Sequence, residues 1–154
     1  MRIPKAIFGL VREAARHILR RPVIGITAIA RVDDGRLVLI RRGDTGEWCL
    51  PGGTLDWGET LRDAVTRELL EEAGVRVVSL GRLVGVVSRP DRDPRMHGVS
   101  VVVEARVTEP SVAPMNPLEV LEVGLFADAE VPAHLAFHLE DALRWSEAGT
   151  TDWE

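Results

Sequence analysis

Hydrophobic positions divide the chain into alternating helical and extended segments. In residues 4–20, apolar side chains recur three and four positions apart with basic residues between them, which predicts an amphipathic helix. Pro22 ends this helix, and the nearly uninterrupted apolar run 23–32 predicts a buried strand. An Asp-Asp-Gly turn at 33–35 then leads into a returning strand at 36–41, so these two segments should form a hairpin.

A second helix is expected between Thr60 and Gly74. Thr60 is a residue type that caps helix N-termini, with Asp63 three residues later, and Gly74 is suited to the C-terminal cap. The apolar stripe of this helix has helical spacing and consists of Leu61, Ala64, Val65 and Leu69.

The remaining strands and a third helix complete the pattern. Pro132 opens a last helix at about 133–147. The strands are expected at 48–50, at 75–87 as one strand or two with an interruption near Gly81 and Arg82, at 99–107 and at 120–126. Helix, strands, helix, strands, helix is the order of an α/β fold with a mixed sheet covered on both faces.

Composition narrows the class of protein. With 154 residues and 45% apolar content, the chain suits one domain with a substantial core, here 22–154, preceded by a helical extension, 1–21. The net charge of −5 argues against a nucleic-acid binder, and we find no membrane-spanning run or signal peptide. The single cysteine, Cys49, excludes an internal disulfide and a multi-cysteine zinc site. These features predict a cytoplasmic enzyme without nucleic-acid or membrane partners.

Three glutamates at the end of the second helix carry the candidate chemistry. Glu68 lies three and four positions before Glu71 and Glu72, so the three carboxylates share one helix face and repel one another. A hard divalent cation with oxygen ligands would compensate this repulsion, and Gly52 and Gly53 would let backbone approach the ion or a phosphate. The alternative is a solvated acidic face without a ligand.

The spacing around these glutamates resembles a known signature. Gly53, Glu59, Arg67-Glu68-Leu69, Glu71-Glu72 and Gly74-Val75 are separated by five, seven, one and one residues. At every specified position this resembles the signature of the Nudix hydrolases. The resemblance implies an α/β/α sandwich with a mixed β-sheet, to which the N-terminal amphipathic helix is an addition.

The resemblance also implies a reaction and residue roles. Nudix hydrolases split a nucleoside diphosphate linked to another moiety, with Mg²⁺ or Mn²⁺. The positions that match the family's metal ligands are the Gly52 carbonyl, Glu68, Glu71 and Glu72. Arg67 matches an arginine that orients a glutamate, and Glu59 one that braces the loop against the helix. For the general base, Glu68, Glu119 and Glu122 all remain candidates.

The loop at 89–97 bears on the substrate. Pro90 lies fifteen residues after Val75, and Arg92-Asp93-Pro94-Arg95 with His97 is similar to a segment of the ADP-ribose pyrophosphatase subgroup, although Met96 replaces a frequent glycine. Arg92 and Arg95 could grip a phosphate or sugar hydroxyls, with His97 hydrogen bonding nearby. Equally, internal Arg–Asp pairs could simply fix this loop. Trp48 either packs in the core or stacks on a base.

The predicted activity is metal-dependent hydrolysis of ADP-ribose or a related nucleoside diphosphate sugar to a nucleoside monophosphate and a sugar phosphate. Two alternatives are a triphosphate pyrophosphatase acting on 8-oxo-dGTP-like nucleotides and a non-catalytic nucleotide-sensing module. Cleavage of capped RNA fits poorly with the acidic net charge. The partner is thus a small nucleotide, and the wide apolar stripe of helix 4–20 favours a homodimer.

Overall fold

The computed structural model describes residues 21–154. The helix expected at 4–20 lies outside the described residues, so this helix and the homodimer inferred from it stay predictions. No helix within 21–154 is both long and apolar enough to span a membrane.

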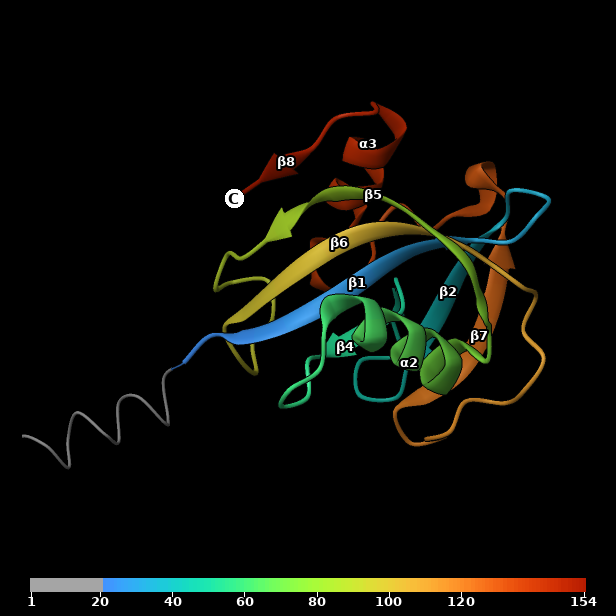
Figure 1. Ribbon diagram of the computed structural model, residues 1–154, viewed down its shortest axis with the longest axis horizontal. Coiled ribbons are helices and arrows are strands. Elements are labelled where there is room, and N and C mark those ends of the chain that lie inside the picture. Colours follow the sequence, from blue (N-terminus) through green and yellow to red (C-terminus); the bar gives the residue numbers. More distant parts are fainter. Residues whose placement is uncertain (1–20) are drawn as a thin grey trace, which may run out of the picture.

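A mixed sheet built around β1 (Val23–Arg31) forms the centre of the molecule (Figure 1). β1 runs parallel to β6 (Gly98–Val107) over its whole length and antiparallel to β2 (Leu37–Arg42). β5 (Val77–Val87) pairs with β6 and carries β8 (Asp152–Trp153) at its other edge. The short strands β3 (Trp48–Cys49) and β4 (Gly52–Thr54) pair with β2 and β1, and β7 (Val120–Phe126) pairs with β2.

The helices lie on opposite sides of this sheet, with α2 (Leu61–Ala73) below β1 and α3 (Glu140–Glu147) beyond β5 in Figure 1. The predicted ends of α2 are confirmed. The Thr60 hydroxyl accepts a hydrogen bond from the Asp63 N–H at 3.3 Å, and Gly74 adopts a left-handed conformation with φ 63°. The α/β/α sandwich expected from the sequence is therefore the fold.

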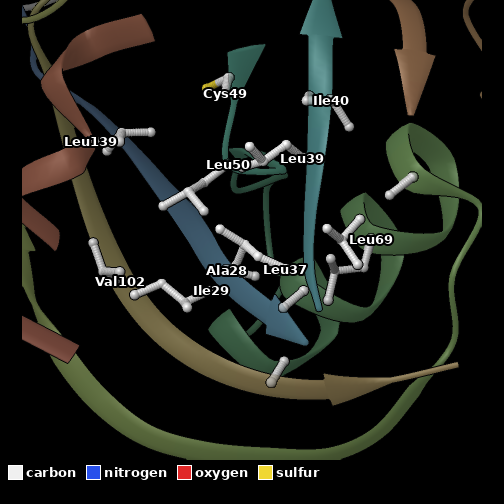
Figure 2. Packing of buried hydrophobic residues seen from close by; sticks show 14 of the residues in the cluster. Ala28, Ile29, Leu37, Leu39, Ile40, Cys49, Leu50, Leu69, Val102 and Leu139 are labelled. Atoms are coloured by element: carbon white, nitrogen blue, oxygen red, sulfur yellow. The ribbon is translucent and has the colours of Figure 1, made fainter. Parts of the chain in front are cut away.

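The core fills the space between the sheet and its helices (Figure 2). Its members include Leu37 and Leu39 of β2, Ile29 of β1 and Leu69 of α2, and all four side chains are almost fully buried. Leu61, expected in the apolar stripe of α2, is instead partly exposed because it lies in the first turn, at the edge of the contact. The long apolar runs of β1 and β2 reflect strands that are covered on both faces.

The final helix is shorter than predicted. α3 begins at Glu140, and the residues before it form a single turn, η2 (Ala136–His138). Phe137 and His138 have φ values of 62° and 55°, which a right-handed helix cannot accommodate. The prediction of one helix over 133–147 was therefore wrong at its start.

Region 75–87 contains one strand rather than two. The interruption expected near Gly81 and Arg82 is present as register shifts between β5 and β6, at Leu80/Leu83 and Leu83/Gly85. The sequence pattern did not predict β4 or β8, which have three and two residues. Strands this short carry no periodic signal of their own.

Candidate active site

A cleft of about 400 Å³ opens where β4, α2 and the loop at 89–97 meet. The glutamates of α2 and the glycines of β4 line one part of it, and the loop lines another. The sequence-predicted residues that it brings together are Gly52, Arg67, Glu68, Glu71, Glu72, Arg95 and Glu119. The cleft therefore gathers the metal-ligand candidates and one arginine of the substrate loop in a single site.

Glu72 is a buried carboxylate held against the glycine strand. Its side chain accepts a hydrogen bond from the Gly52 N–H at 2.8 Å, and the residue is 7% exposed. Burial raises the pKa of Glu72 to about 8, the Gly52 N–H partly opposes this rise, and neighbouring Glu68 adds to it. An ionised Glu72 at neutral pH therefore requires a positive charge beside it.

Glu68 lies beside Glu72, and its carboxylate occupies space that is free because residue 53 is a glycine. A Cβ atom on Gly53 would lie 2.2 Å from the Glu68 Oε1 atom, so only glycine leaves space for this carboxylate. Burial also raises the pKa of Glu68, against the opposing effect of Arg67. The glycines of β4 thus allow two carboxylates to approach the backbone closely.

Arg67 organises the acidic residues from the side. Its Nε and Nη2 atoms donate to the two oxygens of Glu59, both at 2.9 Å, and Nη1 donates to Glu68 at 2.9 Å and Glu71 at 3.3 Å. The hydrogen bonds from Arg67 lower the pKa of Glu59 to about 2. The Asp56 N–H also donates to Glu59 at 3.0 Å, so Glu59 links the loop before α2 to Arg67.

The donors suit a hard divalent cation by their chemistry. Carboxylate and carbonyl oxygens are the ligands that Mg²⁺ and Mn²⁺ prefer. Within residues 21–154 no three acidic, histidine or cysteine side chains already converge on one point, since Glu68 and Glu71 pair with Arg67 instead. The buried carboxylates of Glu68 and Glu72, which repel each other, nevertheless suit such an ion, because a cation would remove the cost of their burial.

The two carboxylates late in the chain, Glu119 and Glu122, lie in different places. Glu119 lines the cleft, and the Gly43 N–H donates to its backbone carbonyl at 2.7 Å, which ties it to the end of β2. Glu122 lies on β7 and pairs with Arg41 at 3.0 Å, and it is not among the cleft-lining residues of the described chain. Of these two candidates for the general base, Glu119 is the one placed near the α2 glutamates.

The two candidate arginines of the 89–97 loop, Arg92 and Arg95, also lie in different surroundings. Arg95 lines the cleft and pairs with Asp93 and Asp44 at 2.8 and 2.6 Å. Arg92 is only 7% exposed, and its guanidinium is engaged by Asp141 and Glu154. This geometry favours the internal-pairing alternative for Arg92 and leaves Arg95 as the substrate candidate.

His97 and Trp48 lie outside the cleft lining. The His97 Nε2 atom lies 2.8 Å from the Ser88 carbonyl, across the base of the loop. Trp48 packs edge-to-face on Phe126 with ring centroids 4.8 Å apart. For Trp48 this favours core packing over base stacking.

Several cleft residues were not predicted from the sequence. They are Arg42, Asp93, Phe137, Thr27 and Ser100. Arg42 was detectable as a cation ending an apolar strand, whereas Phe137 lies where a regular helix was expected. Cys49 also lines the cleft, but burial raises the pKa of its thiol to about 12, so it is not a nucleophile at neutral pH.

Comparison with known proteins agrees with this geometry. The NUDIX domain model matches residues 20–147, which is most of the chain. The crystal structure of a MutT NUDIX hydrolase from Burkholderia pseudomallei is 35% identical, with a TM-score of 0.70, over 82% of this chain and 98% of that one.

Curated relatives carry two different substrate names. An ADP-ribose pyrophosphatase from Methanocaldococcus jannaschii is 40% identical over 83 residues, 53% of this chain and 48% of the relative. A putative 8-oxo-dGTP diphosphatase from Bacillus subtilis is 36% identical over 73 residues, 47% of this chain and 48% of the relative. The matched segments thus span about half the length of each relative. From the family model and the site geometry together, the chain belongs to the Nudix hydrolase family.

Proposed function

We propose that this protein hydrolyses the diphosphate bond of ADP-ribose or a related nucleoside diphosphate sugar, with Mg²⁺ or Mn²⁺ as cofactor. The products would be a nucleoside monophosphate and a sugar phosphate. The observation that carries this proposal is the buried pair Glu68 and Glu72 against the glycines of β4, in a cleft open to a ligand. Two buried carboxylates this close to an open cleft are a costly arrangement unless a cation serves them.

The residues of the signature have distinct roles in this reaction. The Gly52 carbonyl, Glu68, Glu71 and Glu72 would hold the cation, which when bound neutralises diphosphate oxygens and lowers the pKa of an attacking water. Arg67 orients Glu68 and Glu71, and Glu59 fixes Arg67 from the opposite side. Glu68 or Glu119 would accept the proton from the attacking water.

Two observations support the sugar-containing substrate. Arg42 and Arg95 also line the cleft, and one relative is named ADP-ribose pyrophosphatase. A triphosphate such as 8-oxo-dGTP is the second candidate, because a relative of similar identity carries that name. The choice between them depends on residues outside the signature.

A substrate panel tests the proposal directly. ADP-ribose, GDP-mannose, UDP-glucose and 8-oxo-dGTP would be compared at equal concentration with Mg²⁺ and with a chelator, and the products identified by mass spectrometry. We expect metal-dependent release of AMP and ribose 5-phosphate from ADP-ribose. A tenfold or greater preference for 8-oxo-dGTP would reject the sugar substrate, and binding without turnover of any compound would favour the sensing module.

The metal site is tested by Glu72→Gln. The glutamine amide oxygen can still accept from the Gly52 N–H, so the fold should persist while the anionic ligand is lost. We expect kcat to fall by at least about 100-fold, since even indirect ligand contacts cost 10- to 100-fold. Calorimetry with Mn²⁺ should show weaker binding at the same time.

The matched control for this variant is Glu47→Gln, at an exposed glutamate outside the cleft lining. It should leave turnover and Mn²⁺ affinity unchanged. Full activity in folded Glu72→Gln would show that the metal assignment is wrong.

A further inference from the structure

A strained turn lies in the wall of the cleft. Phe137 and His138, the last two residues of η2, both have left-handed backbones, with φ values of 62° and 55°. Bulky residues rarely adopt this conformation, because the Cβ atom crowds the adjoining peptide. Two such residues in succession persist only where surrounding contacts hold them.

Arg92 supplies these contacts. Its Nη1 atom donates to the Phe137 carbonyl at 3.0 Å and to the His138 carbonyl at 2.5 Å. Both carbonyl groups of the strained turn therefore have one guanidinium as their partner. Arg92 itself belongs to the 89–97 loop, so this loop and the turn are held as one unit.

Two carboxylates fix the orientation of Arg92. Its Nη2 atom donates to Asp141 at 2.8 Å, and its Nε atom donates to Glu154 at 2.9 Å. Glu154 follows directly after β8 and also contacts the Nη2 atom. The donors of Arg92 are shared among these groups and the residue is only 7% exposed, so its guanidinium is held in this one orientation.

The turn places the Phe137 ring close to two cations. The Cζ atoms of Arg42 and Arg95 lie 4.8 and 5.2 Å from the ring centroid. Both guanidiniums also pair with Asp44. We call Phe137, Arg42 and Arg95 the Phe137 wall, and all three residues line the main cleft.

A second cavity of about 120 Å³ adjoins the main cleft at Phe137. Phe137 and Asp93 line both the cavity and the main cleft. The cavity also contains the hydroxyl groups of Thr27 and Ser100, which are hydrogen bonded to each other at 2.8 Å. Hydroxyls, a carboxylate and an aromatic ring together suit a hydroxyl-rich group such as a sugar.

We propose that the Phe137 wall is the specificity-determining contact for the sugar on the far side of the diphosphate, and that Arg92, fixed by Asp141 and Glu154, is its positioning residue. This inference rests on the proposed function, because it requires a nucleoside diphosphate sugar as substrate. Arg92 also lines the second cavity, but its donors are engaged by the turn carbonyls, Asp141 and Glu154, so it acts through the backbone of the Phe137 turn.

Two variants separate the wall from the residue that positions it. Phe137→Gly removes the ring and suits the left-handed backbone, so the fold should persist. Arg92→Lys keeps the charge but cannot supply the five donors of a guanidinium. In both variants we expect KM for ADP-ribose to rise about tenfold while kcat changes less than twofold, the size of effect typical of one lost pocket contact.

Arg36→Lys is the matched control. Its guanidinium also joins two acidic residues, Asp34 and Glu109, but it lies outside both cavities. This variant should leave KM and kcat unchanged. Circular dichroism would confirm that each variant is folded, and Phe137→Gly decides the question if Arg92→Lys does not fold.

Product inhibition shows which half of the substrate contacts the Phe137 wall. In Phe137→Gly the inhibition constant of ribose 5-phosphate should rise, while that of AMP should not change. A rise for AMP alone, an unchanged KM, or a fall in kcat without a change in KM would overturn the inference while leaving the proposed function intact. A wild-type protein that hydrolyses no nucleoside diphosphate sugar would reject both.

Discussion

Gly53 shows how one residue controls the position of a candidate metal ligand. Gly53→Ala would put a Cβ atom 2.2 Å from the Glu68 Oε1 atom, so the carboxylate must move aside. A displaced side chain costs little stability, but a shift of about 1 Å in a reacting group can cost about 100-fold in rate. We expect kcat to fall by about that factor with an unchanged melting temperature. A variant with wild-type turnover would show that Glu68 need not occupy this position.

The predictability of single residues followed the distance to their partners in the chain. Glu68, Glu71 and Glu72 share a helix turn with Arg67, so local spacing was sufficient to bring them together. Arg92 bonds residues more than forty positions later in the sequence, which no local pattern contains. Its role in substrate binding was an open alternative for that reason.

The same distinction holds for the elements. α2 was predicted at both ends because Thr60 and Gly74 are its own local caps. The start of α3 was not, because Arg92 holds the carbonyls of the preceding turn in a left-handed backbone. β8 was missed because a two-residue strand depends on its pairing with β5.

Gly85 controls the docking of β8 on β5. A Cβ atom there would lie 2.1 Å from the Asp152 carbonyl oxygen and 3.0 Å from the Trp145 ring. We expect Gly85→Val to displace β8, to cost about 1–3 kcal/mol of stability as overpacking does, and to release Glu154 from Arg92. Hydrogen exchange should become faster at the Glu154 amide, which donates to the Val86 carbonyl at 3.3 Å.

The control for this change is Val78→Ala, at an exposed position of the same strand that does not pair with β8. It should leave the exchange rate of Glu154 unaltered. Gly85→Val should also raise KM for ADP-ribose as Arg92→Lys does, and slow exchange at Glu154 in that variant would contradict the proposed link.

For the molecule as a whole, Glu154 makes stability depend on pH in acid. The hydrogen bond from Arg92 lowers the pKa of Glu154 from 4.5 to about 2. Because the folded-state pKa is the lower one, the stabilisation is complete above pH 4.5 and is lost as pH falls toward 2. The difference in unfolding free energy between wild type and Glu154→Gln should therefore shrink across this range. A difference that stays constant from pH 6 to pH 2.5 would exclude this ion pair as its source.

Assembly is the other property of the whole molecule that can be tested. The apolar stripe of residues 4–20 favours a homodimer. We expect light scattering to give the mass of a dimer for the full chain and of a monomer after deletion of residues 1–20. A dimer that survives the deletion would assign the contact to another surface.

The pairing of β8 with β5 has a consequence for solubility. A long outer strand offers unpaired backbone groups to a strand of another molecule, which is a common start of aggregation. β8 covers Gly85 and Val86, register shifts distort the strand near Leu83, and Arg82 donates to the carbonyls of Trp145, Ser146 and Thr150 beside it. The segment that orients Arg92 thus also protects the sheet from intermolecular pairing, so changes that loosen it should lower the concentration at which the protein stays monodisperse.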